Sequence, residues 1–313
     1  MKFSEVVSLY ISYKRTLGHK YHSEEAVLRS FCKGVGNDPF ISIQTEAVLT
    51  FLNGRGPITG YWMKKYRVLS GLYRFALARG LTKMSPLPRT IPNSNAPVFT
   101  PYIYSHEELK RLLNAVPVAC AGRVPIQGDV LKTLLLILYG AGLRIGEALA
   151  LTLKDVDMNQ SYLYIRDTKF FKSRLVPMGN DLTEILNVYI VMQQKRHPAP
   201  AEEAHLFCFR DGSPLSQSAT RNAFRRLRLH AGVLRPDGAR HQPRLHDLRH
   251  TAAVHRLIAW YQKGENLQDL LPKLAAYMGH VDLSSTQRYL TMTPELLQQA
   301  SLRFENYAIG GGL

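Results

Sequence analysis

Apolar residues recur at helical spacing over residues 1–90. They follow one another at intervals of three and four positions over 6–13 and 48–52, and Gly54 ends the second run. A longer amphipathic stretch runs from Tyr61 to Arg79. Its apolar side chains share one helical face and its basic side chains an adjacent stripe: Val68, Leu69, Leu72, Phe75 and Ala76 on the face, and Lys64, Arg67 and Arg74 on the stripe. The pattern predicts a helical N-terminal unit.

Prolines at positions 86, 88, 92 and 97 then interrupt the helical pattern. Proline lacks an amide hydrogen and fixes φ, so this stretch favours extended or turn conformations. After it, Ser105 and Glu108 match a capping box, which signals the start of a helix. We therefore expect a helical arm at 1–88, a linker at 89–104 and a second domain at 105–313.

The second domain begins with helical patterns and then changes period. The apolar stretch 130–139 reads as helix, and Gly140 and Gly142 predict a turn into a further helix. From Tyr162 to Val176 apolar residues alternate with period two, which predicts a small antiparallel sheet or hairpin. The remainder, 181–307, reads as helical with breaks at 197–202 and 233–245. The expected fold is mainly α with a small antiparallel β-sheet, an α+β domain after an all-helical one.

The charge balance favours a polyanionic partner. The 313 residues carry 40 Lys and Arg against 24 Asp and Glu, a formal net charge of +16. Because the basic residues are spread over the chain and form no isolated tail, a nucleic-acid groove is favoured over a membrane surface. The three cysteines form no Cys-x-x-Cys pair, and no apolar run is long enough to span a membrane. We expect a cytoplasmic protein without a thiolate metal site.

Six side chains of the second domain together supply what phosphodiester transfer requires. A tyrosine hydroxyl attacks phosphorus, and cationic side chains hold the phosphoryl charge and protonate the leaving oxygen. Each has an ordinary explanation alone: Arg144 would pair with Glu147, and Lys169 would be solvated in a turn. Their joint occurrence argues for catalysis. The set is Arg144, Lys169, His246, Arg249, His280 and Tyr289.

In order and spacing this set resembles the tyrosine recombinase (phage integrase) family. The resemblance covers roughly residues 105–295, in four segments that correspond to the family's first arginine box, β-hairpin lysine, His-x-x-Arg box and Gly-His…Tyr box. They are Gly142-Leu-Arg144-Ile-Gly-Glu147, Thr168-Lys169 followed by Arg174-Leu-Val-Pro177, His246-Asp-Leu-Arg249-His250, and Met278-Gly-His280 followed by Thr286-Gln-Arg-Tyr289. The basic helical arm is similar to the family's core-binding (SAM-like) domain, without a sharp motif.

The resemblance implies a role for each residue. Tyr289 attacks the scissile phosphate and forms a 3′-phosphotyrosine bond, which frees a 5′-hydroxyl. Arg144 and Arg249 grip the non-bridging oxygens, to which His280 also donates. His246 assists proton removal from Tyr289 or holds the phosphate. Because the phosphotyrosine keeps the bond energy, neither a metal nor another cofactor is expected.

Two places depart from the family pattern. Lys169 is implied as the general acid for the leaving 5′-oxygen, but the expected turn contains no glycine, so Lys172 could serve instead. Lys169 is favoured because it ends the first strand. The thirty-one residues from Arg249 to His280 exceed the usual spacing, and we expect a loop between two helices around 261–272. That loop is either a harmless insertion or a subunit or DNA contact.

Further histidines and basic residues have two interpretations each. His250 and His255, beyond the His-x-x-Arg box, are interpreted as structural, with an orienting role for His250 as the alternative. The basic residues contact DNA phosphates or form a solvated surface, and Arg228 belongs to the cluster on the predicted helix around Phe224. The other candidates for DNA contact are Lys64, Arg67, Arg74, Lys172, Arg174, Arg221, Arg225 and Arg226.

We expect a DNA site-specific recombinase, an integrase or transposition enzyme of a mobile element. It would act on double-stranded DNA in the bacterial cytoplasm, associated with the nucleoid, as a homotetramer on two DNA sites, with or without a second recombinase or a DNA-bending protein. Two alternatives stay open: an accessory or regulatory member of a multi-recombinase system, and a type IB topoisomerase-like enzyme that relaxes DNA. The segment after Tyr289 starts a helix at Thr293-Pro294-Glu295 and docks either on its own domain or on a neighbouring subunit.

Overall fold

The computed structural model describes residues 1–36, 38–55, 58–92, 100–122, 124–166, 173–197, 203–235, 241–280 and 282–291, together with residues 298 and 301. These residues form two compact units, one within residues 1–92 and one from residue 100 onward. Each unit has its own hydrophobic core. The exact bounds of arm, linker and second domain stay a prediction.

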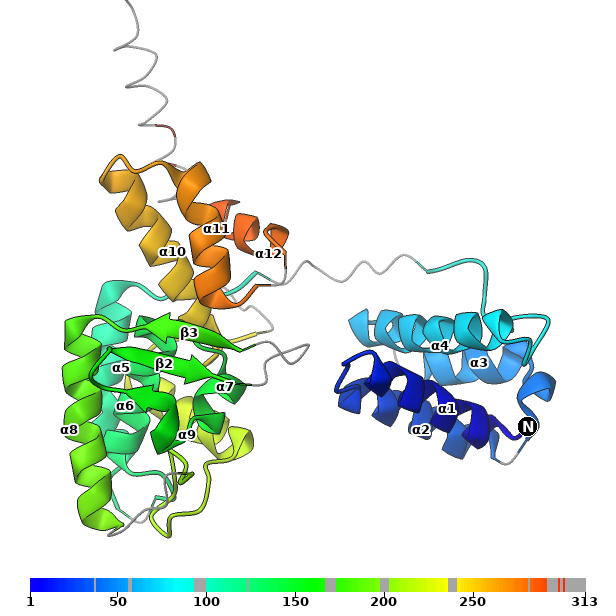
Figure 1. Ribbon diagram of the computed structural model, residues 1–313, viewed down its shortest axis with the longest axis horizontal. Helices are drawn as coiled ribbons and strands as arrows, with labels where there is room; N and C mark the ends of the chain where they lie inside the picture. Colours follow the sequence, from blue (N-terminus) through cyan, green and yellow to red (C-terminus); the bar gives the residue numbers. More distant parts are fainter. Residues whose placement is uncertain are drawn as a thin grey trace, which may run out of the picture. The chain divides into compact units, whose positions relative to one another are not determined.

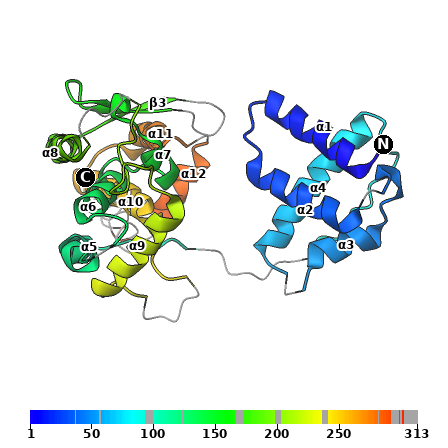
Figure 2. The same cartoon turned by 90° about the horizontal axis from the view of Figure 1, so that it is seen from below.

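The described part of the first unit is a bundle of four α-helices (Figure 2). They are α1 (Phe3–Thr16), α2 (His22–Val35), α3 (Thr45–Asn53) and α4 (Gly60–Ala78), with the 3-10 helix η1 (Phe40–Ser42) before α3. Helix α4 packs against each of the other three α-helices. Its predicted apolar face is confirmed, because Leu69 and Leu72 are fully buried in the bundle core. The basic stripe of α4 is thereby turned away from that core.

The second unit contains the remaining elements (Figure 1). Its first helices are α5 (His106–Ala119), α6 (Gly128–Gly140) and α7 (Ile145–Ala150). The 3-10 helix η2 (Leu153–Asp155) and the strands β1 (Val156–Asp157), β2 (Tyr162–Ile165) and β3 (Arg174–Pro177) follow. The chain continues with α8 (Asn180–Arg196), α9 (Gln217–His230), α10 (Asp247–Gln262), α11 (Leu267–Met278), α12 (Ser284–Gln287) and η3 (Arg288–Thr291).

Helix α6 is the centre of the second unit. It packs against α5, α7, α8 and α10, and it is apolar on most sides, as a helix enclosed by neighbours must be. Its buried side chains include Val130, Leu131, Leu134, Leu135, Ile137 and Leu138. Although α6 is this apolar, no described helix combines the length and the hydropathy that a membrane crossing requires. The predicted cap of α5 is confirmed, because Ser105 Oγ accepts the amide of Glu108 at 3.1 Å.

The sheet is antiparallel, in the order β1-β2-β3. Its period-two pattern is confirmed, because Leu163 and Ile165 are buried whereas Tyr164, between them, is exposed. Ile165 of β2 pairs with Arg174 of β3, so the register places Arg174 at the end of the sheet where β3 meets α11. The predicted fold class, mainly α with a small antiparallel sheet, is confirmed.

Helices α10 and α11 lie side by side, with α12 beside α11 (Figure 1). The expected loop between two helices is present but short, at 263–266. Its predicted extent of 261–272 is wrong, because α10 runs to Gln262, α11 begins at Leu267, and Pro272 lies inside α11. Burial of Leu271, Leu274 and Met278 against α10 outweighs the hydrogen bond that Pro272 cannot make. Most of residues 261–272 therefore belong to two packed helices.

Candidate active site

Arg144 lies at the turn between α6 and α7. Gly142 makes that turn with φ +61°, a conformation that favours glycine, and a Cβ there would come within 2.8 Å of Met278 Sδ. Arg144 then caps α7, and its backbone amide donates to Glu147 Oε2 at 3.0 Å. Its side chain is 38% exposed, so the guanidinium can reach a ligand from solvent.

Glu147 joins two arginines. Arg144 Nη1 donates to Oε1 at 2.7 Å, and Arg174 donates from Nη1 at 3.1 Å and from Nη2 at 2.9 Å. Arg249 Nη1 is 4.0 Å from Oε2. Burial alone would raise the pKa of Glu147, but the hydrogen bonds and charges of Arg174 and Arg144 outweigh it and lower that pKa to about 2. Glu147 is therefore an anion that orients the arginines of the site.

Three consecutive carbonyls at the C-terminus of α11 accept hydrogen bonds from three different arginines. Arg174 Nε donates to Tyr277 O at 3.1 Å, Arg249 Nη2 to Met278 O, and Arg144 Nη2 to Gly279 O at 2.9 Å. A helix C-terminus presents carbonyls without intrahelical partners and the negative end of the helix dipole, so it favours cations. The end of α11 thus gathers arginines that lie up to 105 residues apart in sequence.

Arg249 is the most enclosed of these cations. It extends from the first turn of α10, is 2% exposed, and also donates from Nη1 to Gly142 O. Burial, and then the charge of Arg144, lower the pKa of Arg249 to about 10, which leaves it cationic at neutral pH. A charge held this rigidly is prepared to bind an anion without rearranging.

His280 follows the helix end. Gly279 ends α11 in the left-handed conformation with φ +66°, and His280 Nδ1 lies 2.6 Å from Thr286 Oγ1 of α12. Burial, together with the charges of Arg249 and Arg144, lowers the pKa of His280 to about 4. A neutral imidazole whose Nδ1 accepts the threonine hydroxyl keeps a proton on Nε2, and that nitrogen is the donor for a ligand.

Tyr289 lies on η3 and is 2% exposed. Its ring is 6.0 Å from that of His280, and its hydroxyl is 3.1 Å from His250 Nδ1. Burial raises the pKa of Tyr289, and the charges of Arg249, Arg144 and Arg288 oppose that rise. The tyrosine is therefore a neutral phenol in a cationic environment.

His246 directly precedes α10, at the exposed edge of the site. Its ring lies 5.0 Å from that of His250, at 87°. Partial desolvation and the charges of Arg249 and Arg244 lower the pKa of His246. Among the described residues, the hydrogen-bond partner of the Tyr289 hydroxyl is His250, for which the sequence leaves a structural and an orienting role open. Its position directly after Arg249 in the His-x-x-Arg box was the available signal.

The structure thus brings together five of the six predicted catalytic residues: Arg144, His246, Arg249, His280 and Tyr289. The sixth, Lys169, and its alternative Lys172 lie outside the described residues. Within the described ranges, no three His, Cys, Asp or Glu side chains gather as metal ligands do.

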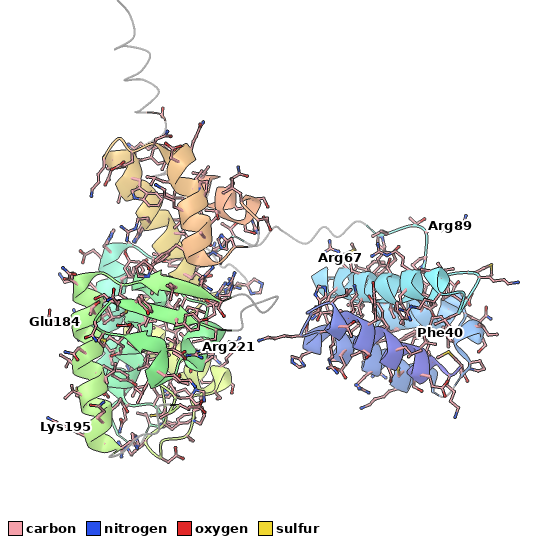
Figure 3. The ribbon with its side chains drawn as sticks, in the orientation of Figure 1. Phe40, Arg67, Arg89, Glu184, Lys195 and Arg221 are labelled. Atoms are coloured by element: carbon pink, nitrogen blue, oxygen red, sulfur yellow. The ribbon has the colours of Figure 1, made fainter. Side chains whose placement is uncertain are left out.

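The predicted DNA-contact residues divide into two groups. Arg174 is only 13% exposed and its donors are directed to Glu147 and Tyr277, which favours a positioning role over DNA contact. Arg228 is buried, donating to Val233 O and Gln242 Oε1, so its predicted place on an exposed basic face is wrong. The exposed members are Arg221, Arg225 and Arg226 on α9 and Arg67 and Arg74 on α4, with Lys64 partly exposed; Figure 3 labels Arg67 and Arg221.

In the first unit the α4 stripe lines a groove between α1 and α4. Both aromatic and basic side chains line it, among them Tyr10, Tyr13, Lys14, Lys64, Arg67, Arg74 and Arg79. Basic side chains suit a phosphate backbone, and aromatic rings among them support the long cationic chains. The three predicted residues Lys64, Arg67 and Arg74 therefore share one surface.

Known proteins resemble the chain along nearly its whole length. Residues 104–295 match the sequence profile of the phage integrase family. The chain is 34% identical over 312 residues to “Putative integrase/recombinase y4rB” of Sinorhizobium fredii, covering 97% of each protein. It is 28% identical over 288 residues to tyrosine recombinase XerC of Bacillus pumilus, covering 90% of this chain and 87% of that protein.

Solved structures share the fold. The Tn1549 transposon integrase in complex with a circular intermediate DNA matches with a TM-score of 0.68 at 18% identity, over 96% of this chain and 99% of that one. A lambda integrase dimer bound to a COC′ core site matches with a TM-score of 0.64 at 16% identity, over 94% and 97%. The predicted family is confirmed: the chain belongs to the phage integrase family of tyrosine recombinases, enzymes that cleave and rejoin DNA.

Proposed function

We propose that this site-specific recombinase cuts a DNA strand by attack of the Tyr289 hydroxyl on phosphorus. The bond from Tyr289 to phosphorus forms, the bond from phosphorus to the 5′-oxygen breaks, and that oxygen takes up a proton. The proposal rests on the buried Tyr289 hydroxyl, which lies close enough to Arg249 and Arg144 to feel their positive charges. Both arginines donate hydrogen bonds to carbonyls at the C-terminus of α11. Resealing is the reverse reaction, with the 5′-hydroxyl as nucleophile.

The side chains around Tyr289 have separate roles in this proposal. Arg144 and Arg249 bind the non-bridging oxygens, because planar guanidinium groups match the charge that spreads over a pentacoordinate phosphorus. His280 donates from Nε2 to the same oxygens, since its Nδ1 is paired with Thr286. Lys169 stays our candidate for protonating the 5′-oxygen, with Lys172 as the alternative.

Basic surfaces in both units support binding of double-stranded DNA. We assign phosphate contacts to the groove between α1 and α4 and to the exposed arginines of α9. These contacts would fix the register of the duplex and would not read its sequence. Binding of this kind would also associate the protein with the bacterial nucleoid.

The number of Tyr289 nucleophiles that strand exchange needs indicates how many chains must act together. Each chain supplies one Tyr289, whereas exchange between two duplexes cuts four strands. A homotetramer on two DNA sites therefore provides one nucleophile for each cut. We further propose a mobile element as the source of the gene, which the similarity to an integrase/recombinase of Sinorhizobium fredii supports.

Covalent trapping tests the proposed chemistry. Nicked duplexes that tile both flanks of the gene would be incubated in chelator with the wild type, with Tyr289→Phe, and with Tyr139→Phe as the control. Tyr139 makes the same kind of tyrosine–histidine contact elsewhere, with His255 at 2.8 Å. We expect a denaturant-resistant adduct with the wild type and Tyr139→Phe, and none with Tyr289→Phe.

Three results would contradict the proposal. They are an adduct with Tyr289→Phe, a strict metal requirement, and no wild-type adduct on any fragment that the protein binds. Where an adduct forms, joined products from two different fragments distinguish strand exchange from simple relaxation.

A further inference from the structure

The hydroxyl of Tyr289 has a defined partner in the protein before any DNA is present. His250 Nδ1 lies 3.1 Å from it, and the two rings pack with centroids 5.6 Å apart. His250 extends from α10 one residue after Arg249, so the helix that carries the phosphate-binding arginine also carries this contact. The phenolic proton therefore has a short path to an imidazole nitrogen.

The other two histidines are placed for different tasks. His280 turns Nδ1 to Thr286 Oγ1 at 2.6 Å, which leaves Nε2 for the phosphate. His246 contacts the edge of the His250 ring, with centroids 5.0 Å apart, and lies at the exposed rim. Within the described residues, His250 is thus the histidine in hydrogen-bond contact with the nucleophile.

Burial and the surrounding positive charges keep the His250 ring neutral. Burial is the largest cause, and His246, Arg249, Arg244 and Arg288 add to it, which together lower the pKa of His250 to about 3. A neutral ring can accept a proton at Nδ1, whereas an imidazolium there could not. The phenol becomes acidic only as its oxygen bonds to phosphorus, so transfer to such a weak base accompanies the attack.

We infer that His250 takes the proton of Tyr289 during strand cleavage and returns it during resealing; this rests on the proposed function. As the bond from the Tyr289 oxygen to phosphorus forms, the phenolic proton moves to His250 Nδ1 and gives an imidazolium. The leaving 5′-oxygen receives its proton from the separate general acid. When the 5′-hydroxyl attacks the phosphotyrosine, it returns its proton to that same general acid, now in its basic form. The imidazolium of His250 protonates the departing tyrosine oxygen, so each half-reaction balances.

His250→Asn separates proton transfer from packing. The asparagine carbonyl oxygen takes the place of Nδ1 and still accepts a hydrogen bond, but it does not accept a proton at neutral pH. His255→Asn is the matched control, because His255 lies on the same helix and its Nδ1 contacts Tyr139 at 2.8 Å. The assay is single-turnover adduct formation on the nicked fragment that wild type cleaves, from pH 6 to 9.5, with DNA affinity measured in parallel.

We expect His250→Asn to slow adduct formation about 100-fold or more at pH 7, with DNA affinity within about twofold of wild type. Its rate should rise steeply with pH, because hydroxide must then remove the proton, whereas the wild-type rate should change far less. His255→Asn should match wild type. Added imidazole should accelerate His250→Ala at least tenfold, by supplying the missing base.

An adduct rate for His250→Asn within threefold of wild type, with the wild-type pH profile, would overturn the inference. The same holds if His246→Asn acquires the steep pH dependence and His250→Asn does not. Where His250→Asn no longer binds DNA, imidazole decides the matter: failure to accelerate His250→Ala refutes a proton-accepting role. Loss of the wild-type adduct itself would instead count against the proposed function.

Discussion

Replacing Glu147 by glutamine should destabilise the second unit by about 3 kcal/mol at pH 7. The side chain is 9% exposed and pairs with Arg144 and Arg174, and Arg174 is itself only 13% exposed. At about 1.4 kcal/mol for each tenfold change in proton affinity, a pKa near 2 in place of the ordinary 4.5 corresponds to about 3 kcal/mol in favour of the carboxylate. Removing one partner of a buried ion pair destabilises by about 3–5 kcal/mol, which is consistent.

Urea denaturation followed by tryptophan fluorescence measures this effect. The chain has two tryptophans, Trp62 in the first unit and Trp260 in the second, so a Trp62→Phe background makes the signal report on the second unit. Glu184→Gln provides the matched control, because it is the same substitution at an exposed position on α8 (Figure 3). The control should stay within about 0.5 kcal/mol of the background protein.

The pH dependence of the Glu147→Gln effect has a definite sign. The pKa of Glu147 is lower in the folded than in the unfolded chain, so its stabilisation is present above about pH 4.5 and is lost as pH falls toward 2. The difference between background and Glu147→Gln should be complete at pH 7 and fall to about half by pH 3. A loss at pH 7 no larger than that of Glu184→Gln, or a difference that does not shrink in acid, would refute the assigned ion-pair role.

Two further predictions concern backbone geometry and DNA binding. Gly279→Ala should destabilise the second unit and slow adduct formation at least about tenfold, because φ is +66° and the new Cβ would lie 2.7 Å from Arg174 Nη1. Gly264→Ala is the control for backbone strain alone, because Gly264 has φ +72° and nothing lies within 4 Å of its Cβ. Equal effects of the two substitutions would contradict the packing argument. Neutralising one basic residue of the α1–α4 groove should flatten the slope of log affinity against log salt concentration by about one. Lys33→Gln, at an exposed position on α2, is the control and should leave the slope unchanged. An unchanged slope for a groove substitution would exclude the substituted residue from the DNA interface. The groove substitutions are Lys64→Gln, Arg67→Gln and Arg74→Gln.

Much of the secondary structure could be predicted from local pattern alone. The amphipathic face of α4, the cap at Ser105 and the alternation in the two described strands, at 162–165 and 174–176, depend on interactions within a few residues, and the structure confirms each. The predicted extension of the loop to Pro272 is wrong for the opposite reason. There, apolar contacts with α10 outweighed the local preference of proline, and no local pattern reports such contacts.

The sequence by itself determined the family and the set of side chains available for phosphodiester transfer. The motifs around Arg144, Arg249 and His280, followed by Tyr289, fix the order of the candidate residues along the sequence. This order does not depend on how the chain folds. Their spacing along the chain is enough to recognise a recombinase. It does not say which donor meets which acceptor.

Those pairings were decided only by the tertiary structure. Arg174 could have faced DNA, but the sheet register and the end of α11 direct it to Glu147 and Tyr277. His250 could have been packing, but the course of the chain from α11 to η3 brings Tyr289 onto it. The physical reason is that unpaired carbonyls at a helix end and buried charges must be satisfied by groups far away in sequence, and the periodicity of the chain does not record which groups those are.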